Sequence, residues 1–187
     1  MTTYLEIGAT IFGLIQGVLV MLNKRSNWIA YSIQMLLMIF FSLSMNLYGD
    51  VVNSSIYLIL GIIGYIIWNK KSEKDIQKCS IKEKIGYSLV ILIATFIVFL
   101  ILNKTDDPLP LLDAFTTTSS FVATYYMMTK KIDTWIIWFI NDIFYAIEYF
   151  ILPEQALSLF GLNVIWTIMA ITSYIKWKKI MYRGESI

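Results

Sequence analysis

The stretch TWIIWFINDIFYAIEY, from Thr134 to Tyr149, is apolar enough to lie in a membrane, yet it carries an amide and two carboxylates. We predict that it forms a helix, because aromatic and acidic residues recur in it at intervals of three and four and so share one helical face. The residues on this face are Trp135, Trp138, Asp142, Tyr145 and Tyr149, flanked by Asn141 and Glu148. A helix that faced lipid on all sides would not tolerate this set, so we interpret the face as a binding site.

The composition indicates an integral membrane protein. Of the 187 residues, 58% are hydrophobic and only 15% are charged, and the mean hydropathy is +0.67. A soluble domain has roughly 25% charged residues. The charges here stand in short clusters between long apolar runs, which is typical of membrane-spanning chains. The net charge of +2 is too small to favour nucleic-acid binding.

Seven segments have the length of about 20 residues that a helix needs to cross the hydrocarbon core. They cover residues 4–22, 28–47, 51–69, 85–103, 109–128, 134–152 and 156–177. The fifth is the least hydrophobic, because TTTSS stands at 116–120 within it. We expect these hydroxyls to be buried among helices rather than to face lipid. The fold class that follows is an all-α membrane protein with seven transmembrane helices.

The basic residues predict how these helices are oriented. All but one of the 15 lysines and arginines fall in the first, third and fifth connections and at the C-terminal end. Because cytoplasmic loops retain positive residues, we expect the N-terminus outside and the C-terminus in the cytoplasm.

The chain also contains a weak internal repeat. Tyr65 and Trp68, at the end of the third predicted helix, recur with the same spacing as Tyr174 and Trp177 at the end of the seventh, and NKRSNW at 23–28 matches KKIDTW at 130–135. Residues 4–69 and 109–177 would then be two three-helix bundles of one membrane domain, joined by a linker helix at 85–103. We therefore predict a parallel 3+1+3 repeat, which is a transporter architecture.

Polar residues at membrane depth mark a candidate pathway, because they are costly to bury in lipid. Gln34 lies well inside the second predicted helix, and Asn163 has a similar depth in the seventh. Asn53 lies close enough to the turn at 47–50 to be a helix cap in the headgroup region. Asp142 and Glu148 are alternative carriers of protons or sodium ions.

The tryptophans divide into two groups. Trp28, Trp68 and Trp177 adjoin basic residues at helix ends, and we interpret them as interfacial anchors. Trp138 precedes Asn141 and Asp142 by one turn, and Trp135 stands one turn before Trp138, near a cytoplasmic end where an interfacial anchor is the alternative interpretation. An aromatic face beside a carboxylate suits a flat, cationic or partly apolar ring, because the π face attracts a cation and the carboxylate balances its charge.

Several functional classes are excluded by the residues present. The chain has no histidine and one cysteine, Cys79, so a histidine metal site, a histidine-based triad and a disulfide framework cannot form. It has no nucleotide-binding loop and no nucleophile paired with a base. We therefore predict that it is not an enzyme and uses no metal or cofactor. A membrane receptor or assembly factor, whose polar residues bind partner helices, is the alternative from another class.

Three motifs together resemble the PnuC family of nicotinamide riboside transporters: LYGD at 47–50, GYIIW at 64–68 and DAFTTTSSFVATYYMMTKKIDTWIIWFIND at 113–142. The resemblance covers the second to seventh predicted helices, and its most recognisable element is W-x-x-W followed by Asn or Asp. It implies a SWEET-like 3+1+3 fold in the bacterial inner membrane. It also implies uptake of nicotinamide riboside by facilitated diffusion for NAD biosynthesis, with a cytoplasmic kinase that traps the product.

The resemblance further implies a substrate site for a pyridinium cation and a ribose. The two tryptophans would stack the ring or line its path, and the amide and carboxylate after them would bind ribose hydroxyls or balance the charge. Gln34, Asn163 and Tyr57 would complete the site from the other half. The candidate residues are Trp135, Trp138, Asn141, Asp142, Gln34, Asn163, Tyr57, Tyr145 and Asn53.

One departure from the family bears on the substrate. Family members carry a glutamine shortly after the LYGD-type turn, where this chain has Asn53, an amide on a shorter arm. Thiamine, riboflavin or a sugar is therefore an alternative substrate on the same scaffold. The implied partners are the small-molecule substrate, the lipid bilayer and, as an open alternative, further copies of the chain.

Overall fold

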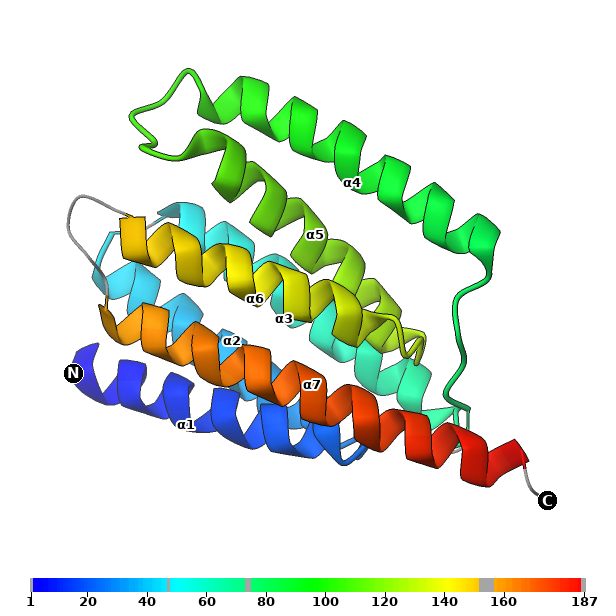
Figure 1. Cartoon of the computed structure of the whole chain (residues 1–187). Coiled ribbons are helices and arrows are strands. Elements are labelled where there is room, and N and C mark those ends of the chain that lie inside the picture. Colours follow the sequence, from blue (N-terminus) through cyan, green and yellow to red (C-terminus); the bar gives the residue numbers. More distant parts are fainter. Residues whose placement is uncertain (1, 47, 73–74, 152–156, 186–187) are drawn as a thin grey trace. The chain divides into compact units, whose positions relative to one another are not determined.

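The computed structural model describes residues 2–46, 48–72, 75–151 and 157–185, and within them the chain forms seven α-helices (Figure 1). Outside these helices, the same residues contain one isolated parallel β-bridge, between Gln77 and Lys131. The predicted all-α class with seven helices is confirmed. The helices are α1 (Thr2–Met21), α2 (Asn27–Ser44), α3 (Tyr48–Asn69), α4 (Ile81–Leu102), α5 (Pro110–Met128), α6 (Thr134–Ile151) and α7 (Leu157–Glu185).

Two helix ends differ from the prediction for clear physical reasons. Helix α4 begins four residues early, because the hydroxyl of Ser80 accepts the Glu83 N–H at 3.2 Å and the Glu83 carboxylate accepts the Ser80 N–H at 2.7 Å. Helix α7 continues to Glu185 rather than ending at Trp177, because lysines end the membrane-crossing part of a helix and not the helix itself. The predicted ends at Leu47 and Leu152 and the start at Ala156 lie outside the described residues.

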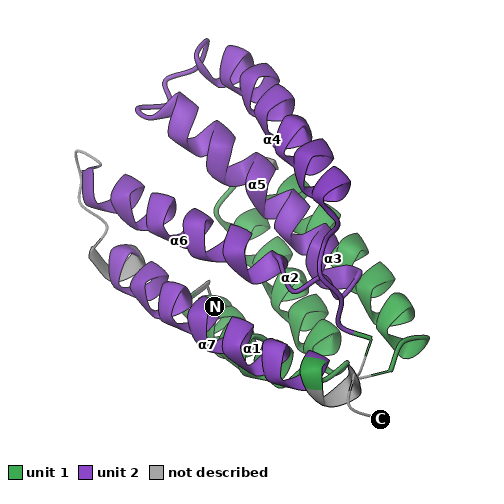
Figure 2. Cartoon of the chain, turned by 45° about the vertical axis from the view of Figure 1, so that its right-hand side comes forward, with its two compact units in different colours: residues 1–75, 182–187 green, residues 76–181 purple. Residues whose placement is uncertain are grey.

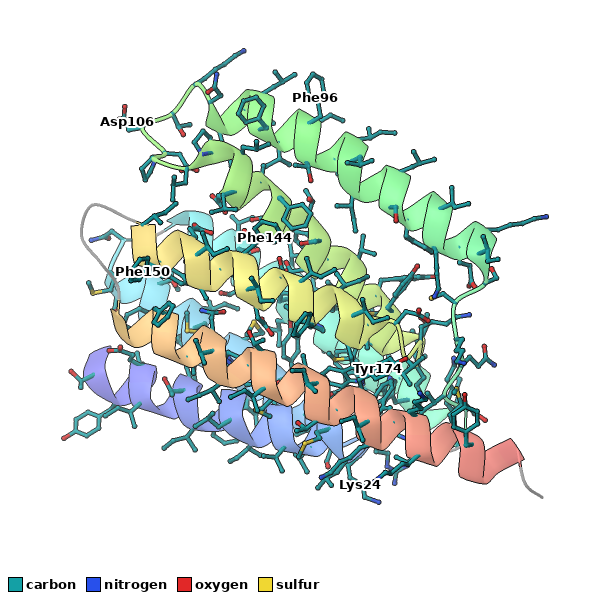
Figure 3. All side chains as sticks on the ribbon, in the orientation of Figure 1. Lys24, Phe96, Asp106, Phe144, Phe150 and Tyr174 are labelled. Carbon is teal, nitrogen blue, oxygen red and sulfur yellow. The ribbon has the colours of Figure 1, made fainter. Side chains whose placement is uncertain are left out.

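Five helices are long and apolar enough to cross a membrane: among the residues described, these are α1, α2, α3, α4 and α6. The most apolar is α4, with a mean hydropathy of 2.8 and only Thr95 buried. Large apolar side chains are exposed around it, and Phe96 points away from α5 (Figure 3). A helix that is apolar on all sides but little covered by protein requires a lipid environment.

The chain divides into two compact units (Figure 2). The first comprises Met1–Asp75 and Tyr182–Ile187 and contains α1, α2 and α3. The second comprises Ile76–Met181 and contains α4, α5, α6 and most of α7. Within the first unit α2 contacts both α1 and α3, and within the second α5 contacts both α4 and α6.

Glycines let the first unit pack closely around α2. A Cβ atom on Gly64 would stand 2.6 Å from ring carbons of Trp28, and one on Gly61 would stand 2.8 Å from the hydroxyl of Ser32. Trp28 is 1% exposed and meets Trp68 edge to face, with ring centroids 5.8 Å apart. The interpretation of Trp28 and Trp68 as interfacial anchors is therefore wrong, because their indoles fill the interior of the unit.

Replacing Gly64 by alanine should destabilise the protein by about 1 to 3 kcal/mol, because the added methyl group overlaps a buried indole that has no room to move. Gly86→Ala on α4 is the matched control, since a Cβ there meets nothing within 4 Å. Thermal unfolding in detergent measures both. Equal melting temperatures for the two variants would show that Gly64 is not a packing site.

The hydroxyl-rich segment of α5 is buried in the second unit, as predicted. Thr116 is fully buried and Ser119 is 1% exposed. The Thr118 hydroxyl lies 2.7 Å from the Thr95 hydroxyl of α4 and donates to the carbonyl of Ala114, four residues back in its own helix. Side-chain hydroxyls thus satisfy one another and their own helix, which lets α5 lie between two helices without leaving polar groups unpaired.

Aromatic contacts at both ends hold α7 against α6. The ring of Trp177 meets that of Trp135 edge to face, with centroids 5.4 Å apart and planes at 89°. Near the other end, Phe150 and Phe160 lie 5.7 Å apart. Because Trp177 is 0% exposed, its interpretation as an interfacial anchor is also wrong.

The carboxylate of Asp133, just before α6, ties the start of α4 to the turn between α5 and α6. Its Oδ2 accepts the backbone N–H of Cys79 at 2.7 Å, and its Oδ1 pairs with the Nζ of Lys84 at 2.7 Å. Alongside, the Ile132 N–H donates to the Gln77 carbonyl at 2.8 Å. Burial alone would raise the pKa of Asp133, but the Cys79 and Lys84 contacts outweigh it and lower the pKa below its ordinary value.

Asp133→Asn should destabilise the protein by about 1.5 to 3 kcal/mol, the usual worth of hydrogen bonds to a charged group. Because the folded-state pKa is lowered, this stability is present above the unfolded pKa of about 3.9 and is lost as the pH falls through the folded pKa. The stability gap between wild type and variant should therefore close in acid. Thermal unfolding at several pH values measures it, with exposed Asp106→Asn as the control. A gap that does not shrink as the pH falls below the unfolded pKa would contradict the charge assignment.

Candidate functional site

Helix α6 has one buried face of mixed polar and aromatic residues and one exposed apolar face. Trp135, Asn141 and Asp142 are buried, and Trp138 and Tyr145 are half-buried. The exposed residues on other sides of the helix include Ile136, Ile140, Ile143 and Ile147. This is the reverse of a helix on a water-soluble protein, and it agrees with a helix whose apolar side faces lipid and whose polar side faces protein or substrate.

The amide of Asn141 is fully buried and is held at one end only. One end of the amide lies 2.8 Å from the hydroxyl of Ser119 on α5, and the other end has no hydrogen-bond partner. Phe115 and Phe144 pack edge to face about one turn away, with centroids 5.0 Å apart, and hold α5 against α6. The amide is therefore positioned by protein and still has hydrogen-bonding capacity for a ligand.

Buried polar atoms without partners concentrate on α6. In the part of the chain that the structure describes, eight such side-chain atoms occur, and four belong to Trp135, Trp138, Asn141 and Glu148. Each unpaired buried group costs about 1 to 3 kcal/mol. A run of such groups along one helix is expected where a substrate supplies the missing partners.

The acidic residues of α6 differ in their surroundings. Asp142 is 6% exposed, and neither the ion pair of Lys84 with Asp133 nor that of Lys131 with Glu83 includes it. Glu148 is half-buried. Between them, Tyr145 stacks on Tyr149, with centroids 6.1 Å apart and planes 11° from parallel. The buried carboxylate of Asp142 is thus the acidic group best suited to a cationic ligand.

The remaining predicted residues are divided between the units. Asn163 is buried on α7, in the same unit as α6, so its assignment to the other half of the site is wrong. Gln34 lies on α2 in the first unit. Its amide packs so close to Gly13 of α1 that a Cβ atom added to this glycine would stand 2.8 Å from the Nε2 of Gln34. Tyr57 meets Tyr31 edge to face at 6.3 Å, and Asn53, one turn earlier on α3, is exposed.

Two cavities of the second unit are not lined by Trp135, Trp138, Asn141 or Asp142. One, of about 310 Å³, lies between α6 and α7 and is lined by apolar residues such as Ile147, Phe150 and Phe160. The other, of about 290 Å³, lies between α4, α5 and α6 and reaches Ser119 and Asp133. The first cavity is lined by apolar residues except Thr167, which suits contact with acyl chains better than recognition of a polar solute, whereas Lys84, Ser88 and Asp133 also line the second.

Two residues near the predicted set were not assigned to the site from the sequence: Ser119, although the hydroxyls at 116–120 were candidates as a group, and Tyr31. Ser119 stands within a segment predicted to be buried, but helical spacing does not reveal its contact with Asn141 on another helix. Tyr31 precedes Gln34 by three residues and so shares its side of α2, which was a usable signal.

Comparison with known proteins identifies transporters as the relatives of this chain. The family model described as "Nicotinamide mononucleotide transporter" matches residues 3–179. The curated "Nicotinamide riboside transporter PnuC" of Neisseria mucosa is 23% identical over 189 residues, which cover 94% of this chain and 72% of that protein. A "Crystal structure of the Vitamin B3 transporter PnuC" superposes with a TM-score of 0.76 at 22% identity, over 97% of this chain and 83% of that one, and this likeness shows a shared fold.

Proposed function

Because the chain belongs to the nicotinamide mononucleotide transporter family, we propose that it takes up nicotinamide riboside by facilitated diffusion. The family makes it a multi-pass transporter of the bacterial inner membrane and not an enzyme. The riboside would pass through by alternating access between two helical bundles. A cytoplasmic kinase that phosphorylates it would then keep the gradient inward and supply NAD biosynthesis.

The observation that carries the proposal is the composition of the α6 face. A pyridinium riboside needs an aromatic surface for its ring, a carboxylate for its charge, and hydrogen-bonding groups for its hydroxyls and carboxamide. Trp138, Asp142 and Asn141 supply these three on one side of one helix, with the carboxylate and the amide buried. Asn163 and Tyr145, of the same unit as α6, would contribute further polar groups, and Gln34 and Tyr57 of the first unit stay candidate residues from the sequence.

The family model is named for nicotinamide mononucleotide and the curated relative for nicotinamide riboside, and the mononucleotide carries one phosphate group more. The candidate residues favour the riboside. None of the nine candidate residues is basic. A phosphate is normally held by arginine, lysine or a helix N-terminus, whereas a buried carboxylate such as Asp142 would repel it. We therefore propose the riboside, and not the mononucleotide, as the transported species.

Uptake into proteoliposomes tests the function. We expect saturable entry of labelled nicotinamide riboside, competition by unlabelled riboside, and no competition by an excess of the mononucleotide. Collapse of a proton or sodium gradient should leave the uptake unchanged, because a uniporter couples to neither. Saturable transport of thiamine or riboflavin without riboside uptake would instead support the alternative vitamins, for which the exposed, short-armed Asn53 is the motivating observation.

The membrane arrangement belongs to the same proposal. All seven helices would cross the membrane as a 3+1+3 repeat, with the N-terminus outside and α4 as the linker. The edge-to-face pair Trp28 and Trp68 in the first unit matches the pair Trp135 and Trp177 in the second, as the weak sequence repeat requires. The alternation of basic connections supports the orientation, which fusion of a compartment-sensitive reporter to each end would test.

A further inference from the structure

The hydroxyl of Ser119 stands at the centre of three oxygen contacts. Its Oγ lies 2.7 Å from the carbonyl oxygen of Phe115, 3.3 Å from that of Thr116, and 2.8 Å from the end of the Asn141 amide assigned as Oδ1. All three partners in this assignment are acceptors. A serine hydroxyl has a single proton to donate.

One proton cannot serve both short contacts. An O···O distance of 2.7 to 2.8 Å is that of a hydrogen bond with a proton between the oxygens. If Ser119 donates to Asn141, its 2.7 Å contact with the Phe115 carbonyl has no proton. If it donates to Phe115, as serines within helices commonly do, the Asn141 contact has none.

If the Asn141 amide is rotated by 180° about its Cβ–Cγ bond, so that its nitrogen and oxygen exchange places, each of the two short contacts has a proton. The two ends of a terminal amide have nearly the same size, so its orientation follows from the hydrogen-bond network. The Asn141 Nδ2–H then donates to the Ser119 Oγ, and the Ser119 hydroxyl donates to the Phe115 carbonyl. The carbonyl oxygen of Asn141 becomes the end without a protein partner, buried on α6 beside Asp142.

We propose that Ser119 is a positioning residue that holds the Asn141 amide with its carbonyl oxygen toward the substrate. The inference rests on the proposed function, because it makes Asn141 an acceptor for a substrate hydrogen-bond donor, namely a ribose hydroxyl or the carboxamide NH2. With the carboxylate of Asp142 next to it, the site selects a donor-rich cation. A substrate presenting only acceptors at this point would leave the carbonyl unpaired and bind more weakly.

Riboside binding to the purified full chain, measured by titration calorimetry, tests this orientation. Asn141→Asp keeps an oxygen toward the substrate and should therefore retain more affinity for the riboside than a variant with no polar atom. Asn141→Leu, of similar size, has no polar atom and should weaken binding at least tenfold, which corresponds to about 1.4 kcal/mol. If Asn141→Asp binds as poorly as Asn141→Leu, the substrate meets the amide N–H and the proposal is wrong.

A double-mutant cycle separates positioning from packing. Ser119→Ala should weaken riboside binding roughly fivefold in the wild-type background, with Ser119→Thr restoring it, because the alanine lets the amide turn over. In the Asn141→Leu background there is no amide to orient, so Ser119→Ala should have no further effect. Equal losses in both backgrounds would mean that Ser119 only packs.

Two controls complete the test. Ser44→Ala removes an exposed serine whose hydroxyl donates to its own helix at the Phe41 carbonyl, 2.6 Å away, and should leave binding unchanged. Failure of the wild-type chain to bind the riboside would reject the proposed function itself. That result is distinct from an altered pattern among variants of a chain that does bind.

Discussion

Asp142→Asn should reduce the affinity for nicotinamide riboside by about a hundredfold, or about 2.7 kcal/mol. The side chain of Asp142 is 6% exposed, so little water screens its interaction with a bound pyridinium. Neither the ion pair of Lys84 with Asp133 nor that of Lys131 with Glu83 involves this carboxylate. We therefore expect the substrate to supply the opposite charge. Truncating one member of a buried charge pair costs about 2 to 5 kcal/mol in comparable interfaces, and asparagine removes the charge with little change of shape.

Two comparisons identify the cause of that loss. The reduced riboside has the same outline but a neutral ring, so its affinity should be nearly the same for wild type and Asp142→Asn. Asp106→Asn, on the exposed connection between α4 and α5 (Figure 3), should change neither affinity. If the charged and neutral ribosides lose affinity equally in Asp142→Asn, the carboxylate supports the local structure and does not recognise the cation.

The helices could be predicted because both their hydropathy and their length follow from the cost of placing charged or polar groups in the hydrocarbon of a membrane. A charged side chain in hydrocarbon is expensive, so the charge clusters mark where the chain leaves the membrane, and the apolar runs between them match the helices within a few residues. Hydropathy does not report where a helix ends in water. The start of α4 depends on the Ser80 and Glu83 cap, whose S-x-x-E pattern was present in the sequence but was not used.

The arrangement of the candidate residues could be predicted along one helix and not between helices. The helical period places Trp138, Asn141 and Asp142 on one side of α6 whatever surrounds them. Which hydroxyl of α5 meets Asn141 depends on how the two helices cross, and the neighbouring threonines and serines are equivalent by spacing alone. Only the packed structure distinguishes Ser119.

The misinterpreted tryptophans have a similar cause. An indole beside a lysine at a helix end suits both the membrane interface and the interior of a bundle. For Trp28 the outcome depends on Gly64 of another helix, whose missing side chain makes room for the ring. For Trp177 it depends on Trp135.

Trp138→Ala should weaken riboside binding at least tenfold, about 1.4 kcal/mol, because the pyridinium would lose the ring on which we propose that it stacks. Trp138 is half-buried and its indole N–H has no protein partner, so the ring is covered by protein yet retains a free donor. Trp135 is less informative, because its ring also packs against Trp177 and its loss would disturb the contact between α6 and α7. Trp138→Phe should keep part of the affinity, since phenylalanine retains a smaller π face.

Titration calorimetry with the riboside and with free ribose locates the contribution of Trp138. Its loss should affect the riboside and leave the much weaker binding of ribose unchanged, because ribose has no aromatic ring. Phe96→Ala is the control, since Phe96 is 61% exposed on α4 and points away from the rest of its unit (Figure 3). An unchanged affinity for the riboside in Trp138→Ala would remove this ring from the site and leave Asp142 and Asn141 to recognise the substrate by charge and hydrogen bonding alone.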